Sequence, residues 1–355
     1  MKTSLSVFAV AVMFMCVVCP VWLHADDPAV GPWFNPTGDA VGGGASYSRM
    51  VTPGTTVSSK EALLNALASA KQGDIVFVAS DAVIDMTGME HIVIPGGVTL
   101  ASGRNGADVP GALVYTVQPK TVPLFETSGP GVRVTGLRLR GPDMERRTKQ
   151  LRELMREGGH DAYYSVPTAD GIISAHSHLE VDNCELYGWS HAAVFLKAGA
   201  TDAHIHHNYI HHNQRSGLGY GVCLDRADAL VEANIFDWCR HHIAGTGRPG
   251  TSYEARHNIV FENANGHSFD MHGGKDRGDG TDVAGTSISI HHNFFLAADV
   301  PAVVIRGVPE KMVEVHHNWF IHDDPAKAVR QTNAEGRISV HTNDYSVSRI
   351  RKEWR

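Results

Sequence analysis

The sequence predicts an all-β fold, a parallel β-helix, because one short strand-like segment recurs and a turn residue ends each copy. The copies read LEVDNCEL, HIHHNYI, LVEANIF, EARHNIV, ISIHHNFF, VEVHHNWF and ISVHTNDY. Their asparagines follow one another at steps of 25, 26, 24, 35, 25 and 25 residues: Asn183, Asn208, Asn234, Asn258, Asn293, Asn318 and Asn343. A period near 25 is too short for a propeller blade and lacks the leucines of a leucine-rich repeat. It fits one solenoid coil of short strands stacked on those of the neighbouring coils.

Asparagine suits the turn that ends each copy. It tolerates the left-handed backbone of a tight turn, and its side chain can bond to nearby backbone groups. Stacked coil on coil, these asparagines should form a ladder. Gly136, in VRVTGLRL, fits the same slot 47 residues before Asn183, a step of one coil plus an insertion.

Twin histidines precede several of the asparagines and raise the question of metal binding. In VEVHHNWF, strand alternation points Val313 and Val315 one way and His316 the other. A metal site needs converging ligands with carboxylate or thiolate among them. A uniform stripe favours a polar outer surface instead, so the sequence assigns no metal ligand. The residues that share the column of His316 are His206, Arg256, His291 and His341.

The first 25 residues predict export. Lys2 precedes an apolar run, and LHA before Asp26 resembles a signal-peptidase site. The alternative, an uncleaved membrane anchor, is less favoured because Pro20 and two aspartates end the run. We expect residues 1–25 to be a signal peptide and residues 26–355 to be a single exported domain, periplasmic or secreted, with no membrane segment.

Charge and cysteine content narrow the function classes. The 31 basic residues less Lys2, set against 38 acidic ones, give a charge of −8, so general nucleic-acid binding is not expected. A local basic cluster would still suit an anionic ligand. Cys184, Cys223 and Cys239 remain after signal removal and lack zinc-finger spacing, so we expect passive, buried cysteines.

The N-terminal part of the mature chain predicts a helix followed by strands. Residues 58–72 form an amphipathic pattern in which Ser58 and Glu61 make a capping box. The strand-like stretches GDIVFVA and HIVIPGGVTLAS follow. This order resembles the right-handed parallel β-helix proteins of the pectate-lyase-like superfamily, in which a capping helix precedes the first coil. The resemblance covers about residues 50–345, with the capping region at about 50–80, and it implies a right-handed helix with a substrate cleft on a strand face.

Two insertions interrupt the repeat. Residues 143–167 contain a charged, helix-like stretch, and residues 273–284 form a loop rich in glycine and aspartate. Calcium binding by Asp276, Asp279 and Asp282 is one interpretation of the second insertion. Their spacing does not match an EF-hand loop, and a solvated loop is the favoured interpretation.

One face of the predicted helix gathers charged and titratable residues. About ten residues after each asparagine lies a second strand whose second and fourth positions are mostly apolar and therefore point inward. Coils stack at about 4.8 Å, so residues on neighbouring coils of this face can share one substrate. The outward positions, with residues flanking them, carry Lys197, Asp225, Arg240, His242, Asp270, His272, Arg306 and Arg330, while His267 lies just before its strand.

The stretch HSFDMHG resembles the D-x-H element of alginate C5-epimerases, which are β-helix enzymes. Asp270 and His272 match the acid and the histidine of that element. His267 stands where the family has a tyrosine, and Met271 stands where it has a proline.

Chemistry suggests roles for these residues. Removing the C5 proton of a uronate needs a positioned base and neutralisation of the adjacent carboxylate. His272, oriented by Asp270, is the candidate base, and Arg306 the candidate carboxylate clamp. The remaining candidates assist: Arg240 or Arg330 at the carboxylate, Tyr220, His242 or His267 as proton donor on the other side, and Lys197 and Asp225 in substrate binding. The predicted partner is an acidic polysaccharide and the enzyme a lyase or a C5-epimerase.

Three other functions stay open. A glycoside hydrolase would use two carboxylates, and Asp225 and Asp270 are predicted two coils apart, about 9.6 Å by strand spacing. A non-catalytic glycan-binding protein would show aromatic platforms, which the outward positions lack. A periplasmic metal-handling protein would account for the high histidine content.

Overall fold

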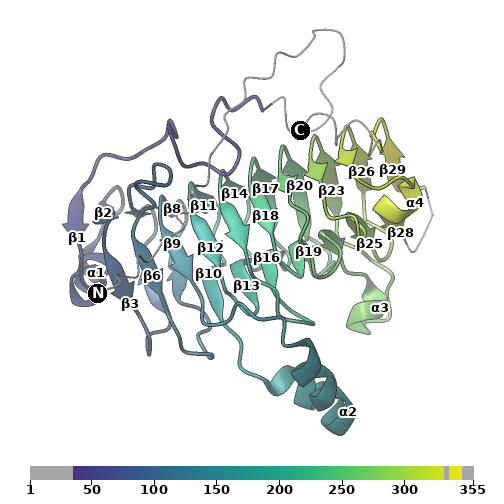
Figure 1. The fold of residues 1–355 in the computed structure, drawn as a ribbon, viewed down its shortest axis with the longest axis horizontal. Coiled ribbons are helices and arrows are strands. Elements are labelled where there is room, and N and C mark those ends of the chain that lie inside the picture. Colours follow the sequence, from purple (N-terminus) through teal and green to yellow (C-terminus); the bar gives the residue numbers. More distant parts are fainter. Residues whose placement is uncertain (1–34, 332–335, 346–355) are drawn as a thin grey trace, which may run out of the picture.

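In the described residues three parallel sheets run along the solenoid, and each full coil adds one strand to each sheet. The computed structural model describes residues 35–331 and 336–345. Within them the strands stack side by side from β1 at one end to β29 at the other (Figure 1). The prediction of an all-β, right-handed parallel β-helix is confirmed. The predicted signal peptide lies outside the described residues.

Sheet A contains the recurring segments that predicted the fold. Every neighbouring pair in it is parallel and in register, as in Val181↔Ile205 and Ile290↔Val315. In spatial order its strands are β1 (Thr55–Val57), β2 (Ile75–Val78), β5 (Thr99–Ala101), β8 (Arg133–Thr135), β11 (Glu180–Asp182), β14 (Ala203–His206), β17 (Asp228–Glu232), β20 (Ser252–Arg256), β23 (Ser287–His291), β26 (Met312–His316) and β29 (Ile338–His341).

Sheet B follows sheet A around each coil, and from β8 to β27 two residues separate the sheet A strand from the sheet B strand. Its strands are β3 (Val83–Asp85), β6 (Leu113–Tyr115), β9 (Arg138–Arg140), β12 (Glu185–Tyr187), β15 (Tyr209–His211), β18 (Ile235–Asp237), β21 (Ile259–Val260), β24 (Phe294–Phe295) and β27 (Trp319–Phe320).

Sheet C carries the charged face predicted from the sequence. Its strands are β4 (Ile92–Ile94), β7 (Phe125–Thr127), β10 (Asp170–Ser174), β13 (Ala192–Leu196), β16 (Tyr220–Leu224), β19 (His241–Gly245), β22 (Phe269–Met271), β25 (Val303–Ile305) and β28 (Val329–Gln331).

The interior of the solenoid is filled by the inward-pointing side chains of the strands of all three sheets. The second positions of the predicted sheet C strands, which are expected to point inward, are buried in this core and include Val222, Ile243 and Phe269. Phe269 packs edge-on against Phe295, with ring centroids 4.9 Å apart. Aromatic burial of this kind contributes several kcal/mol per ring, at about 25 cal/mol per Å² of apolar surface.

Within residues 35–331 and 336–345, four helices lie outside the strands of the coils. α1 (Lys60–Ser69) corresponds to the predicted helix at residues 58–72, and its Leu63 and Leu67 are buried in the core. The side chain that caps it belongs to Ser59, which accepts from the Ala62 amide, so the predicted cap at Ser58 is wrong by one residue. The other helices are α2 (Thr148–Ser165) and α3 (Gly274–Arg277), which lie in the two predicted insertions, and α4 (Pro325–Ala328).

The asparagine ladder is present, but its register differs from the prediction by one residue at its start. Each Oδ1 accepts the backbone N–H of the preceding member, at 2.9–3.0 Å, in the series Asn208, Asn234, Asn258, Asn293, Asn318 and Asn343. Because Asp182 pairs with His206, the residue level with Asn208 is Cys184, whose amide donates to Asn208 Oδ1.

Asn183 therefore lies level with His207 rather than with Asn208. The left-handed conformation belongs to this earlier slot, with φ of 53° at Asn183 and 52° at His207. Gly136, with φ of 70°, shares the slot, because Thr135 pairs with Asp182. The ladder asparagines make the bonds, and the residues before them make the turn.

The twin histidines form an ordered polar stripe on sheet A, as predicted. His206, Glu232, Arg256, His291, His316 and His341 occupy one column. The rings of His291 and His316 are stacked 4.9 Å apart, nearly parallel. Within a twin the two Nδ1 atoms lie 2.8 Å apart, as in His316–His317, so the pair shares one Nδ1 proton.

Candidate functional site

A shared irregularity near the start of the sheet C strands decides which side chains reach the outer face. The pairing of β16 with β19 runs Tyr220↔His241 and then Val222↔Ile243, leaving out Gly221 and His242. Two successive amides, those of His242 and Ile243, donate to the single carbonyl of Ser268. One extra residue is therefore accommodated in each strand, and simple alternation fails at this point.

The prediction that His242 faces outward is wrong. Its side chain is fully buried inside the solenoid, 5.6 Å from the ring of Phe236, and burial lowers its pKa to about 3. The outward histidine of this strand is His241, which the sequence reading missed. Its ring stacks on that of His267, with centroids 4.4 Å apart.

Asp270 is the centre of the site. Its carboxylate has no exposed surface and is surrounded by one arginine and three histidines. Arg306 binds it through two bonds, Nε to Oδ1 at 3.0 Å and Nη2 to Oδ2 at 2.5 Å. His272 Nε2 lies 2.9 Å from Oδ2, and His267 Nε2 lies 3.3 Å from Oδ1.

Electrostatics keep this carboxylate ionised. Burial alone would raise the pKa of Asp270, but its contacts with His241, His267 and His272 hold that pKa well below its usual range. His272 Nε2 must then be the protonated nitrogen, because an ionised carboxylate only accepts. Its other nitrogen, Nδ1, is left as a lone pair on a side chain that is one-quarter exposed.

Arg240 and Tyr220 extend the site toward the N-terminal coils. Arg240 Nη1 donates to Tyr220 Oη at 3.3 Å, and the Tyr220 ring stacks on His241 at 5.8 Å. Burial raises the pKa of Tyr220, so its hydroxyl stays protonated. A continuous series of contacts therefore joins Arg240, Tyr220, His241, His267, Asp270, His272 and Arg306.

Three predicted substrate-binding residues lie farther along the same face. Lys197 sits over the ring of Phe195, 5.4 Å from its centroid. The Asp225 carboxylate accepts a hydrogen bond from Thr246 Oγ1 at 2.8 Å. Arg248 Nη1 donates to both of its oxygens, each at 3.1 Å. Arg330 is exposed on β28, two coils beyond Asp270.

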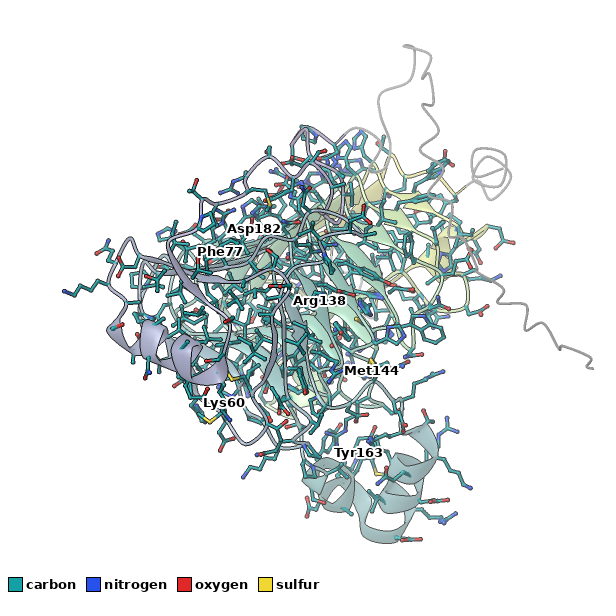
Figure 2. The ribbon with its side chains drawn as sticks, turned by 60° about the vertical axis from the view of Figure 1, so that its left-hand side comes forward. Lys60, Phe77, Arg138, Met144, Tyr163 and Asp182 are labelled. Atoms are coloured by element: carbon teal, nitrogen blue, oxygen red, sulfur yellow. The ribbon has the colours of Figure 1, made fainter. Side chains whose placement is uncertain are left out.

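The two insertions flank this face. α2 and α3 project from the same side of the solenoid (Figure 1), and Tyr163 lies on the side of α2 next to the coils (Figure 2). The Tyr163 carbonyl accepts from Arg215, and Asp276 of α3 contacts Arg306 Nη1 at 3.2 Å. The second insertion thus reaches the centre of the site directly.

The calcium interpretation finds little support in this loop. Asp276 is engaged by Arg306, and Asp279 by Arg277 at 2.7 Å. Their negative charges are therefore already balanced by arginines. Cys223 lies on β16 of sheet C and is buried, and burial raises the pKa of its thiol, as expected of a passive residue.

Comparison with known families agrees with this architecture. Residues 164–345 match the family model described as the right-handed β-helix region. The chain belongs to the right-handed β-helix family. This match confirms the predicted right-handed parallel β-helix.

Several solved β-helix structures are similar to this one. They include an alginate lyase from Paenibacillus sp., at 15% identity and a TM-score of 0.44 over 81% of this chain and 98% of that chain. A mannuronan C-5 epimerase A-module from Azotobacter vinelandii matches at 12% identity with a TM-score of 0.45, over 81% of this chain and 90% of that chain. A family 28 exopolygalacturonase from Yersinia enterocolitica matches at 12% identity with a TM-score of 0.41, over 80% of this chain and 61% of that chain. No curated protein matches the chain significantly.

One further pair of this β-helix protein escaped the sequence reading. His191 Nδ1 lies 2.5 Å from Asp170 Oδ1 on the outer face of sheet C, and the His191 ring meets that of Tyr220 edge-on at 5.6 Å. The available signal was Gly221, because a glycine inside a strand pattern marks a bulge or a close approach. A Cβ at Gly221 would lie 2.5 Å from the His242 carbonyl oxygen.

No helix in the described part of this β-helix protein has the length and apolarity needed to cross a bilayer.

Proposed function

We propose that this chain is an exported enzyme that acts on a uronate-containing polysaccharide by abstracting the C5 proton, as a lyase or a C5-epimerase. The observation that supports it best is the His272–Asp270 pair, 2.9 Å apart. It lies on a strand face that also carries Arg240, Lys197 and Arg330.

His272 is the proposed base. Asp270 fixes its tautomer by accepting the Nε2 proton, so that Nδ1 is free to take a proton from substrate. A buried carboxylate that orients a histidine also stabilises the imidazolium formed in the reaction. Asp270 contacts the base and not the substrate, because it has no exposed surface.

Arg240 is better suited than Arg306 to neutralise the substrate carboxylate. Arg306 spends its Nε and Nη2 donors on Asp270 and contacts Asp276 through Nη1, so we assign it a positioning role. Arg240 donates to a neutral phenol, Tyr220, and keeps most of its donors for a ligand. Lys197 and Arg330 would bind other uronates along the chain.

Tyr220 is the proposed proton donor. Its raised pKa keeps the hydroxyl protonated, and its contact with Arg240 would bring it close to a bound carboxylate. Protonation of the glycosidic oxygen would complete an elimination, and protonation of C5 from the opposite face would complete an epimerisation. His267 remains a second candidate for this step.

The site suits glycoside hydrolysis less well. That reaction needs one carboxylic acid to be protonated near neutral pH. Asp270 has a pKa well below its usual range. Burial would raise the pKa of Asp225, but hydrogen bonds from Thr246 and Arg248 outweigh it and lower that pKa. Neither carboxyl group of the predicted pair is therefore a suitable acid.

The proposal is tested by incubating the mature protein with alginate, pectate and glycosaminoglycans in deuterated water. Shorter unsaturated products would identify a lyase, and deuterium at C5 without cleavage would identify an epimerase. We expect His272→Ala to lower either activity by about 10²–10⁴-fold. His341→Ala is the matched control, because His341 is exposed on sheet A in the last described coil. If wild type leaves every polymer unchanged, or if His272→Ala is as active as wild type, the proposed chemistry is wrong.

A further inference from the structure

Three side chains of the site present ligand atoms to one another without forming normal hydrogen bonds. Ligand atoms of His241, His267 and Asp270 all lie within 4.8 Å of one another. His241 Nε2 is 3.8 Å from Asp270 Oδ2, and His267 Nε2 is 3.3 Å from Oδ1. Both Nε2 atoms are buried and lack a hydrogen-bond partner.

The tautomer of His241 makes this arrangement informative. Its Nδ1 lies 2.6 Å from the carbonyl oxygen of His267, so Nδ1 carries a proton. The ring is wholly buried, and burial favours its neutral form. Its Nε2 is then a lone pair directed at a carboxylate, an arrangement that is repulsive unless a cation lies between them. A histidine that donates one nitrogen to a backbone carbonyl is typical of metal ligands.

The distances suit a shared cation. Two atoms bound to one ion at about 2.0–2.1 Å lie about 3–4 Å apart, which includes both separations measured here. A direct hydrogen bond would require about 2.7–3.2 Å and good alignment.

Arg306 leaves a coordination position on Asp270. An ionised carboxylate offers about four lone-pair sites. Arg306 uses one on each oxygen, and His272 uses one on Oδ2. The remaining site is on Oδ1, the oxygen nearest His267 Nε2.

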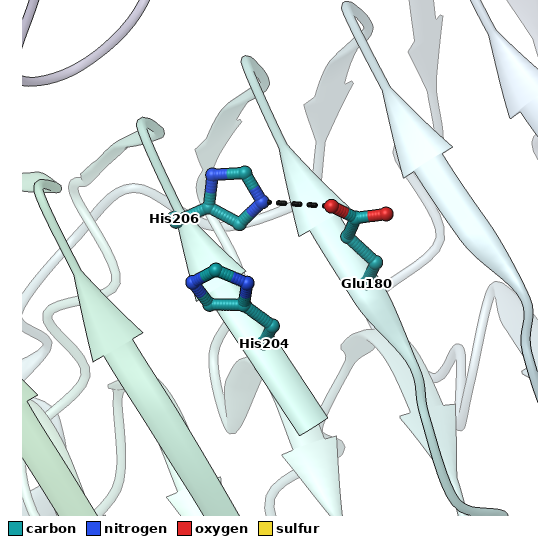
Figure 3. A group of neighbouring side chains, drawn as sticks. All are labelled: Glu180, His204 and His206. Atoms are coloured by element: carbon teal, nitrogen blue, oxygen red, sulfur yellow. Dashed lines mark hydrogen bonds and ion pairs between the residues drawn. The ribbon is translucent and has the colours of Figure 1, made fainter. Parts of the chain in front are cut away.

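A second group with the same composition lacks these features. Glu180, His204 and His206 also gather on sheet A, where His206 bonds to Glu180 (Figure 3). Glu180 is already paired with Arg49 and Arg133, and His204 Nε2 is taken by Glu232 at 3.2 Å. This group needs no cation to balance it.

We propose that His241, His267 and Asp270 bind one divalent transition-metal ion of the Zn²⁺ class. Two imidazoles and one carboxylate suit Zn²⁺ and its neighbours, whereas Ca²⁺ and Mg²⁺ prefer oxygen ligands. The His267 side chain is one-quarter exposed but its Nε2 atom is buried, so the ion would lie just beneath the outer face. If the proposed function also holds, the ion would add positive charge beside a bound uronate carboxylate, but the binding inference does not depend on that role.

The test is Zn²⁺ binding to the full mature chain after chelator treatment, by competition with a chromophoric zinc indicator. We expect one equivalent per chain for wild type and a loss of affinity of at least about 100-fold for His241→Ala and His267→Ala. His204→Ala, in the arginine-filled group, should bind like wild type, and Ca²⁺ should not compete. Co²⁺ in place of Zn²⁺ should give visible absorption bands that vanish in His267→Ala.

Circular dichroism reports whether each variant folds, and His267→Ala decides the matter if the buried His241→Ala does not. Absence of Zn²⁺ binding by wild type overturns the proposal, as does binding retained in His267→Ala or lost only in His204→Ala. Because Zn²⁺ binding is measured without substrate, metal binding with no activity on uronate polymers would contradict only the proposed function. Activity on uronate polymers without metal binding would contradict only the metal site.

Discussion

Arginine and histidine side chains together stabilise the ionised form of the buried Asp270 carboxylate. Arg306 supplies a permanent positive charge with two bonds, whereas His272 supplies one bond whose proton can be exchanged. Arginine is the suitable residue here, because its planar fork matches a carboxylate and its proton is not lost. Because Arg306 keeps its positive charge, Asp270 remains paired whatever the protonation state of His272.

Removing that partner should be costly. We predict that Arg306→Ala lowers the free energy of unfolding by about 3–5 kcal/mol, because it strands a buried charge. Lys327→Ala is the control, since its ion pair with Asp323 is exposed and 3.8 Å long and should contribute less than about 1 kcal/mol. Denaturant unfolding of both variants measures the difference, and equal losses would contradict the burial argument.

The sequence could locate His272 and Arg306, because both follow an inward apolar residue by regular alternation. It could not separate His241 from His242, since adjacent histidines exchange places when one residue is inserted in the strand. Only the pairing across coils, which sets Tyr220 against His241, resolves this. His191 and Asp170 were missed for the same reason, because they lie on the irregular side of their strands.

At the scale of elements, the asparagine ladder joins successive coils. Asn258 Oδ1 accepts both the backbone and side-chain N–H groups of Asn234, and its own Nδ2 donates to the Val231 carbonyl. These groups are buried, so each bond also removes a desolvation penalty. The ladder explains why the asparagine is repeated even where the preceding histidine is replaced by Ala233.

We predict that Asn258→Ala lowers the free energy of unfolding by about 2–4 kcal/mol, since it leaves buried donors unpaired. Asn343→Ala, in the last described coil and only part-buried, should cost about 1 kcal/mol. Denaturant midpoints at neutral pH compare the two. A smaller loss for Asn258→Ala than for Asn343→Ala would contradict a buried ladder.

The repeat was readable because its spacing is nearly constant, but spacing alone did not fix the register. Residue type aligns Asn183 with Asn208, whereas strand pairing shows that Cys184 is the structural counterpart of Asn208. An asparagine can fill either the left-handed slot or the ladder slot, so its identity does not say which one it occupies.

At the scale of the whole molecule, acid should destabilise the fold. Burial lowers the pKa of His207, His257 and His292 to about 4, below the value of about 6.5 for an unfolded chain. The unfolded state therefore binds more protons between these values, and stability is lost as pH falls from about 7 to 4. For the buried His207 and His257 the loss is at least about 1 kcal/mol each.

Carboxylates on sheet A add to this loss at lower pH. Burial would raise the pKa of Glu180 and Glu232, but hydrogen bonds from histidine and arginine lower both to about 2. Their contribution to stability is present above about pH 4.5 and is lost toward pH 2.

Unfolding free energies measured at pH 7.5, 5.5 and 4 test the predicted effect of the histidines. His292→Asn, which keeps a residue tolerant of φ near 54°, should reduce the slope. A flat profile between pH 7.5 and 4 would refute the assignment.

The fold class and the positions of both insertions followed from the sequence, because each insertion lengthens one step of the repeat. That both project beside one face did not follow from it. Which of the three sheets a loop borders depends on how far the chain has turned around the coil, and this is set by three-dimensional stacking.

The stacking order also determines how changes spread through the molecule. Among the described strands of sheet C, β22 pairs with β19 and β25 alone, so the sheet connects Asp270 to distant coils through the coils between them. In such a chain of nearest neighbours, mutational effects at separated positions are expected to add rather than couple. The first and last described coils are thus thermodynamically insulated from the site, and stabilising substitutions made there should change the proposed activity little.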